Sequence, residues 1–153
     1  MLIEALPESE LDSIRPLLLE LLITDAGDPA SPGLRSRLDE ALPRTRATFR
    51  GENHVFAARE QGRILAFCWC VVFDPGTGLE GEVAELYVLP GERGRGLAGR
   101  LLGEATRLFA ERRVTFASVW TDPGNQVALR AYEAAGFTPT EQLVLTWNPP
   151  DGG

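Results

Sequence analysis

The sequence predicts an α/β fold of the α+β type, in which a mixed and mostly antiparallel central sheet carries about four helices. Two adjacent strand-like runs are joined by Gln61-Gly62, which is a hairpin signal. From Leu97 onward, apolar residues recur at helical spacing. A strand-like run lies on each side of that helix, and two strands joined by a crossover helix are parallel. The chain has a single-domain length, residues 1–153, and can bury a proper core.

The first quarter of the chain predicts one strand and two helices. Residues 2–6 have strand character, and apolar residues at helical spacing follow over residues 8–23, with Ser9 as a helix cap. A loop rich in Asp, Gly and Pro, residues 24–33, separates this helix from a second one over residues 34–49.

The middle of the chain predicts three consecutive strands. Residues 54–60 and 63–74 form the hairpin. The second of these strands is apolar on both faces, so we expect it in the centre of the sheet. A turn rich in Gly and Pro then leads to a strand over residues 80–89.

The last third predicts alternating helices and strands. Pro90-Gly91 ends the preceding strand, and a helix over residues 97–112 is followed by a strand over residues 115–121. A second helix over residues 125–135 ends at Gly136, and a final strand is expected at residues 140–147.

Composition excludes several classes of protein. A net charge of −7 argues against a nucleic-acid-binding or anionic-membrane surface. All 15 basic residues are arginine, which removes lysine Schiff-base chemistry. The chain has a single histidine (His54) and no histidine–cysteine cluster, so we predict no metal site. Cys68 and Cys70 lie in an apolar run and are expected to be buried thiols in a reducing cytoplasm. We find no signal-like or membrane-spanning segment, since the run Leu17–Ile23 is too short.

The segment Arg93-Gly-Arg-Gly-Leu-Ala98 predicts a turn that handles phosphate. It joins a strand to the N-terminus of a helix, where unpaired backbone N–H groups and the helix dipole favour an anion. Gly94 and Gly96 let the backbone approach the anion closely, and Arg93 and Arg95 add positive charge.

Two known kinds of phosphate-binding turn are alternatives for this segment: the dinucleotide-binding turn and the nucleotide-triphosphatase loop. Gly94-x-Gly96-x-x-Gly99 matches the dinucleotide fingerprint, with Asp122 as the ribose-binding acid, but a dinucleotide domain needs more strand–helix units than the remaining 54 residues allow. A nucleotide-triphosphatase loop needs a lysine that this chain lacks.

A second segment, residues 125–137, predicts a capped helix with a side chain aimed at the same site. Asn125 and Tyr132 are seven residues apart, so two helical turns place them on one face. Taken alone, the segment is equally an amphipathic helix with a half-buried tyrosine in the core.

Together, the two segments resemble the GNAT superfamily of acyl-CoA-dependent N-acyltransferases. The shared pattern is a strand, an Arg-x-x-Gly-x-Ala turn, a helix, a strand and then Asn-x-x-Ala-x-x-x-Tyr-x-x-x-Gly-Phe, over residues 82–137. Ala98 stands where many members carry glycine, a variant that the family allows. The resemblance implies a GNAT-like sheet whose two parallel strands splay apart, and acetyl-CoA as the co-substrate that enters between them.

The resemblance also implies which residues bind coenzyme A. The strand backbone would pair with the pantetheine arm, the turn and its arginines would hold the pyrophosphate, and an asparagine would position the cofactor. These residues are Leu86, Tyr87, Val88, Arg93, Gly94, Arg95, Gly96, Leu97, Ala98, Gly99 and Asn125.

The implied reaction is direct attack of an amine on the thioester. Tyr132 would lie beside the sulfur as a donor, since a phenol is protonated at neutral pH. Glu85 and Glu82 are the candidate bases, and Glu85 is favoured. They are three residues apart on a strand, so regular alternation puts them on opposite faces unless a bulge intervenes.

The acceptor is expected to be a primary amine of a small molecule or a peptide. By resemblance, the first two helices and residues 24–33 shape its pocket; Asp25 and Asp28 there would suit a cationic amine, although a solvated loop is the simpler interpretation. Trp120 stands where some members that acetylate ribosomal-protein N-termini carry glutamate. We expect a monomer or small homo-oligomer. The alternative function is a catalytically silent acyl-CoA-binding sensor or interaction module, which would not need Tyr132.

Overall fold

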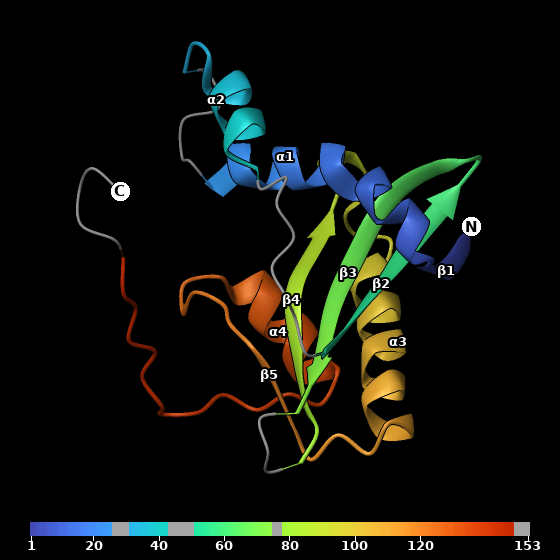
Figure 1. The fold of residues 1–153 in the computed structure, drawn as a ribbon, viewed down its shortest axis with the longest axis vertical. Helices are drawn as coiled ribbons and strands as arrows, with labels where there is room; N and C mark the ends of the chain where they lie inside the picture. Colours follow the sequence, from blue (N-terminus) through green and yellow to red (C-terminus); the bar gives the residue numbers. More distant parts are fainter. Residues whose placement is uncertain (26–30, 43–50, 75–77, 149–153) are drawn as a thin grey trace.

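A computed structural model describes residues 1–25, 31–42, 51–74 and 78–148 of the chain (Figure 1). The elements in chain order are β1 (Leu2–Leu6), the 3₁₀ helix η1 (Glu8–Ile14), α1 (Arg15–Asp25), α2 (Leu34–Ala41), β2 (Gly51–Glu60), β3 (Arg63–Phe73), β4 (Glu80–Val88), the 3₁₀ helix η2 (Pro90–Glu92), α3 (Leu97–Glu111), β5 (Phe116–Val119) and α4 (Gln126–Ala134).

The strands form one mixed sheet in the order β1-β2-β3-β4-β5. The pairs β1–β2, β2–β3 and β3–β4 are antiparallel. The pair β4–β5, whose strands flank α3 in the chain, is parallel. The predicted fold class is therefore confirmed. The apolar strand β3 is central, as expected, because only a strand with neighbours on both edges and helices over both faces buries both sets of side chains.

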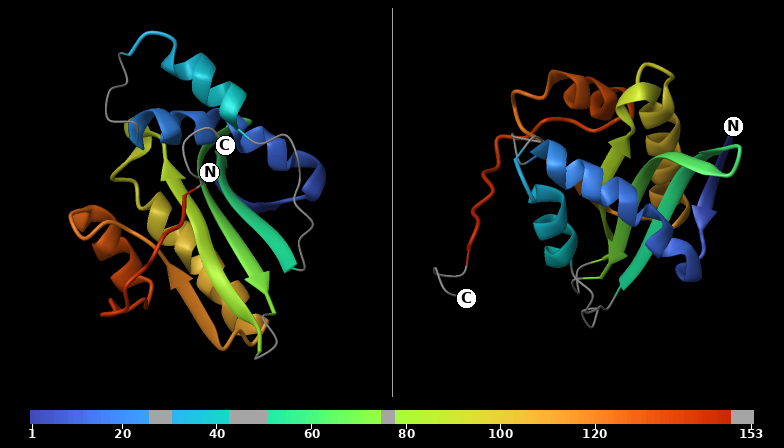
Figure 2. Two further views of the ribbon diagram at one scale, coloured as in Figure 1. Left: turned by 60° about the vertical axis from the view of Figure 1, so that its left-hand side comes forward. Right: turned by 90° about the horizontal axis from the view of Figure 1, so that it is seen from above.

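Helices cover both faces of the sheet, and each face has its own core (Figures 1 and 2). On one face, α3 and α4 pack through Leu101, Leu102 and Tyr132 onto a layer that includes Cys68 and Val83. On the other face, η1 and α1 pack onto a second cluster, made of Leu6, Ile14, Leu17, Val55, Ala57, Ile64, Phe67 and Tyr87. Side chains alternate along a strand, so successive residues of β3 and β4 pack into one core and then the other.

The helix predicted over residues 8–23 is instead a 3₁₀ helix followed by an α-helix. The change falls at Arg15, directly before Pro16, because proline has no N–H to donate and is tolerated only in the first turn of an α-helix. Ser9 is not the cap that the sequence suggested; Pro7 occupies that position and makes no side-chain capping bond.

Two further element predictions change at the ends of the described segments. The helix predicted over residues 34–49 ends at Ala41, and residues 43–50 lie outside the described part of the chain. The strand predicted at residues 140–147 is wrong: residues 138–148 carry no regular structure, and Leu143 and Leu145 are 87% and 91% exposed. A strand needs a hydrogen-bonding neighbour, and β5, whose partner is β4, does not pair with this segment.

Gly81 allows α3 to approach the sheet. A Cβ at this buried position of β4 would lie 2.7 Å from Cε1 of Phe109. We therefore expect Gly81→Ala to lower the free energy of unfolding by about 1–3 kcal/mol through overpacking. Gly103→Ala is the matched control: its Cβ would meet open space inside α3, so it should raise stability by about 0.5–1 kcal/mol. Urea unfolding of both variants measures this, and equal effects would show that the Phe109 contact does not limit the packing.

Candidate active site

The parallel strands β4 and β5 are paired over only four residues of each strand. Their register runs from Glu80 opposite Phe116 to Val83 opposite Val119. Beyond this point β4 continues through Leu86–Val88, whose residues pair with β3 on one edge only. Within the described residues, the other edge of Leu86–Val88 has no strand partner, and we call it the open edge of β4. The Val88 carbonyl accepts a hydrogen bond from Arg93, and an extended ligand would pair with the other backbone groups of this edge.

A bulge in β4 changes which way its glutamates face. Glu82 lies opposite Val71 and Glu85 lies opposite Trp69, so Ala84 is an extra residue in the ladder. Val71 and Trp69 are two apart on β3 and share a face. Both glutamates therefore lie on the α1 side of the sheet, and the opposite-face arrangement expected from regular alternation is wrong.

The open edge of β4 ends at the predicted phosphate turn. Gly94 and Gly96 both have positive φ, +79° and +73°, and Gly96 is the N-cap residue of α3. No side chain caps this helix, so the N–H groups of its first turn, starting at Leu97, have no capping acceptor. The helix is fifteen residues long, and its N-terminal dipole favours an anion at this turn.

The two arginines of the turn differ in their surroundings. Arg93 Nε donates to the carbonyl of Val88 at 3.3 Å. Arg95 is held by carboxylates, with Nη2 donating to Glu60 Oε1 at 3.1 Å and Nη1 donating to Glu92. Glu92 is close in sequence, but Glu60 comes from the end of β2, and no sequence signal indicated that contact.

Helix α4 presents the asparagine and the tyrosine as predicted. Asn125 is the N-cap, and its Oδ1 accepts a hydrogen bond from the N–H of Ala128 at 3.1 Å. This leaves the Nδ2 group as a donor. Tyr132 lies two turns later, buried in the core on the α3 side, with the Phe137 ring edge-on at 6.1 Å.

The environment of Tyr132 keeps its hydroxyl protonated. Burial raises the pKa of Tyr132 to about 12, and Cys68 and Glu85 add to the rise. Among the described residues Tyr132 Oη has no hydrogen-bond partner, yet no fully buried polar side-chain atom there lacks one, so Oη is not sealed from solvent. Tyr132 belongs to the core cluster that Leu86 packs against on the α3 side, whereas Glu85 lies on the opposite side of the sheet.

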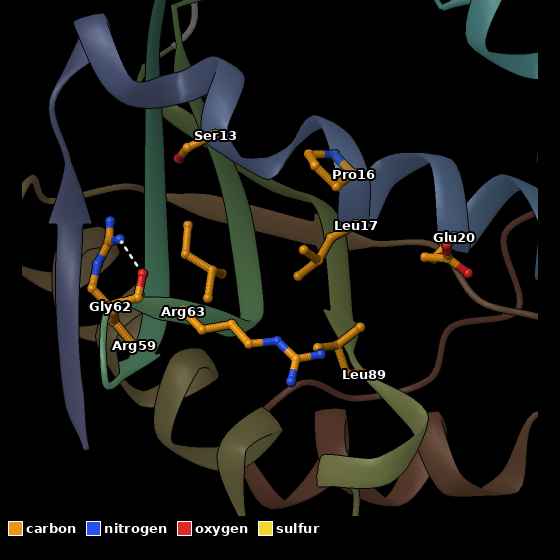
Figure 3. Close-up of a pocket in the computed structure, with 9 residues that line it drawn as sticks. Ser13, Pro16, Leu17, Glu20, Arg59, Gly62, Arg63 and Leu89 are labelled. Atoms are coloured by element: carbon orange, nitrogen blue, oxygen red, sulfur yellow. Dashed lines mark hydrogen bonds between the residues drawn. The ribbon is translucent and has the colours of Figure 1, made fainter.

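Other features of the structure lie apart from these residues. Cys68 and Cys70 are free, buried thiols whose sulfurs are 3.7 Å apart, as the sequence predicts. Over the described ranges, no group of three or more His, Cys, Asp or Glu side chains is arranged to hold a metal ion. A pocket of about 510 Å³ lies between α1 and the β2–β3 hairpin (Figure 3), but none of the predicted site residues lines it.

The described part of the chain also lacks a helix long and apolar enough to cross a bilayer.

The rival dinucleotide-binding interpretation does not fit the topology. Only β5 and α4 follow α3 in the described residues, and most of the sheet is antiparallel.

Comparison with known proteins agrees with this geometry. The acetyltransferase (GNAT) family matches residues 17–137, and the chain belongs to this family. The family predicted from the sequence is thus confirmed.

Among individual relatives, the mycothiol acetyltransferase of Tsukamurella paurometabola is 37% identical over 83 residues, which is 54% of this chain and 28% of that protein. The mycothiol acetyltransferase of Stackebrandtia nassauensis is 30% identical over 122 residues, which is 79% of this chain and 40% of that protein. The chain therefore spans less than half the length of these relatives.

Solved structures show the same fold. A probable acetyltransferase superposes with a TM-score of 0.69 at 24% identity, over 97% of both chains. The aminoglycoside N-acetyltransferase AAC(6')-Iy, solved with a bisubstrate analogue of coenzyme A, has a TM-score of 0.66 at 20% identity, over 96% of this chain and 97% of that one. At these identities the likeness concerns the fold.

The pKa of Tyr132 has a measurable consequence. A phenol with a raised pKa in the folded state contributes stability below the unfolded pKa near 10, and this contribution is lost as pH rises from about 10 towards 12. Absorbance titration should therefore show a phenolate transition near pH 12 that is absent from Tyr132→Phe. A wild-type titration without a transition near pH 12 would show that Tyr132 is solvated rather than buried.

Proposed function

We propose that this chain is an acetyl-CoA-dependent N-acetyltransferase that moves an acetyl group to a primary amine of a small molecule or peptide. The observation that carries the proposal is the open edge of β4, which has Tyr132 in the core on one side of the sheet and Glu85 on the other side, and which leads into the predicted phosphate turn. Membership of the GNAT family supports the same activity.

The cofactor would lie along the open edge. An extended pantetheine arm would run along the open edge of Leu86, Tyr87 and Val88 as an added strand would, and would pair with the backbone groups that point away from β3. The pyrophosphate would then meet the uncapped N–H groups of Leu97, Ala98 and Gly99, in the turn formed by Gly94 and Gly96, with Arg93 and Arg95 beside it and Asn125 positioning the thioester end.

Glu85 is the better candidate for the base. The attacking amine must lose a proton, and a carboxylate on the acceptor side can receive it directly or through a water molecule. Glu82 faces the same side but lies where β4 is still paired with β5, whereas Glu85 lies beyond the bulge, next to the open edge. Glu82 would then attract the amine without accepting its proton.

Tyr132 would stabilise the leaving sulfur by a hydrogen bond. A thiol has a pKa of about 8.5, well below the pKa of about 12 of this phenol, so complete proton transfer from Tyr132 to the thiolate is uphill. A hydrogen bond to the developing negative charge gains strength as solvation decreases, and the largely buried ring of Tyr132 reduces the solvation of its hydroxyl. Backbone N–H groups of the open edge would serve the thioester oxygen in the same way.

We infer the kind of acceptor from the charged side chains near the site and not from the shape of a pocket. Relatives include mycothiol acetyltransferases and aminoglycoside acetyltransferases. Two carboxylates on the acceptor side, Glu82 and Glu85, favour an amine that arrives as a cation. Residues 26–30 of the loop expected to shape the pocket lie outside the described part of the chain.

We place the enzyme in the cytoplasm, as a monomer or small homo-oligomer.

Cofactor binding tests the first half of the proposal. Coenzyme A should bind wild-type protein in calorimetry, with affinity that falls as salt rises, and Arg93→Ala should weaken it by about 1.5–3 kcal/mol if a charge-assisted bond to phosphate is lost. Arg107→Ala, which removes an exposed arginine farther along α3, is the control and should leave affinity unchanged. Tight binding of nicotinamide dinucleotides without any response to coenzyme A would contradict the assignment.

Turnover tests the second half. Tyr132→Phe keeps the ring and its packing, so cofactor affinity and melting temperature should change little, while kcat and kcat/KM fall together by about tenfold or more. The assay is release of free thiol from acetyl-CoA with a panel of amines. If the variant turns over normally but melts earlier, Tyr132 is a packing residue. If wild-type protein binds acetyl-CoA and acetylates no amine, the chain is a sensor module instead.

A further inference from the structure

Arg95 is enclosed by two carboxylates, one local and one distant. Glu92 lies three residues earlier, in η2, and Glu60 is the last residue of β2. Arg95 Nη2 donates to Glu60 Oε1 at 3.1 Å and Oε2 at 3.4 Å, and Nη1 donates to Glu60 Oε2 at 3.4 Å and to Glu92 Oε2. These two nitrogens form the fork with which an arginine binds phosphate in bidentate fashion. The fork therefore already has acceptors.

The hairpin brings Glu60 to this place. Gln61 and Gly62 both have positive φ, +50° and +80°, which is the geometry of a tight two-residue turn. Figure 3 shows Gly62 and Leu89 on opposite sides of one pocket. Farther along the hairpin, the N–H of Leu89 donates to the carbonyl of Leu65 at 3.0 Å, so β3 lies beside the segment that leads into the phosphate turn, and Glu60 contacts Arg95.

The charges of this cluster cancel. Arg93 and Arg95 contribute two positive charges, and Glu60 and Glu92 contribute two negative ones within the same surface region. Hydrogen bonds from Arg95 lower the pKa of Glu60, so its carboxylate is ionised at neutral pH. The Arg95 and Glu60 side chains are 39% and 38% exposed, and exposed ion pairs of this kind open readily.

We propose that Glu60 limits cofactor affinity by competing with the pyrophosphate of coenzyme A for the guanidinium of Arg95. The inference rests on the proposed binding of acetyl-CoA at this turn. Glu60 is a positioning residue that acts through Arg95 and contacts no reacting atom. When the pair with Glu60 opens, the fork becomes available to the phosphate oxygens, and closing of the pair assists release of the product coenzyme A.

The direct test is Glu60→Gln, which keeps the size of the side chain and removes its charge. A neutral amide competes less well than a carboxylate for the Arg95 guanidinium, so the Kd for coenzyme A should fall by about three- to tenfold at low salt. The gain should shrink at high salt, because exposed charges are screened. The 3′-dephospho form of coenzyme A should gain by the same factor, because it keeps the pyrophosphate.

Helix α3 offers a matched control. Arg107 lies between Glu104 and Glu111 in an arrangement like that of Arg95, but two to three turns into the helix and away from the phosphate turn. Glu104→Gln removes the same charge from the protein and should leave the Kd for coenzyme A unchanged. Glu92→Gln is a second variant at the cluster itself and should tighten binding in the same direction as Glu60→Gln.

A double-mutant cycle separates competition from simple repulsion. In an Arg95→Ala background, Glu60→Gln should give no gain if Glu60 acts through Arg95. A gain that persists there, or a Glu60→Gln protein that binds coenzyme A as the wild type does or more weakly, overturns the inference. If the wild-type protein binds coenzyme A and Glu60→Gln binds it with the same affinity, the competition is contradicted and the proposed function still holds. Wild-type protein that does not bind coenzyme A overturns both.

Discussion

The short pairing between β4 and β5 is the constraint on which the candidate site depends. The ladder stops at Val83 and Val119 because β5 ends there, while β4 runs on to Val88. One edge of Leu86–Val88 is therefore left without a strand partner in the described residues. An unpaired strand edge is usually a liability, because it can pair with other chains. In this fold it is the place where an extended ligand would complete the sheet.

The bulge at Ala84 changes which side of the sheet the following side chains of β4 face. Val83 and Leu86 keep their contacts with the core under α3, and Tyr87 packs into the cluster under α1. Because one extra residue is inserted between Val83 and Glu85, Glu82 and Glu85 come to the same face. Glu85 therefore lies on the side of the sheet opposite to the buried ring of Tyr132. The proposed base and the proposed donor thus lie on opposite sides of β4.

Electrostatics of the chain follow from its use of arginine alone as the strong base. An arginine can hold two carboxylates in fixed geometry, and it does so at Arg95 and at Arg107. On α3 such pairs support an exposed helix. At the phosphate turn the same arrangement places negative charge where an anionic cofactor is expected. Net charge and local charge therefore have to be considered separately: the chain is acidic, yet its turn combines helix N–H groups with two arginines.

Much of the fold could be predicted from sequence because its signals are local. The hairpin at Gln61-Gly62, the glycine turn before α3 and the Asn125 cap of α4 each depend on backbone preferences of a few residues, and the structure contains all three. The spacing of Asn125 and Tyr132 likewise determines a shared helix face. The strand pattern of residues 140–147 was equally local, but pairing requires a partner, and the tertiary structure supplies none in the described residues.

The sequence by itself determined which side chains the site could use, and the tertiary structure decided how they meet. Helix caps, turns and alternation are encoded within a few residues, so glycines, arginines, the tyrosine and both glutamates could be named in advance. The face of Glu82, the length of the β4–β5 ladder and the contact of Glu60 with Arg95 depend on register and on residues far apart in the chain. Register is set by the packing of two cores at once, and no local pattern carries that information.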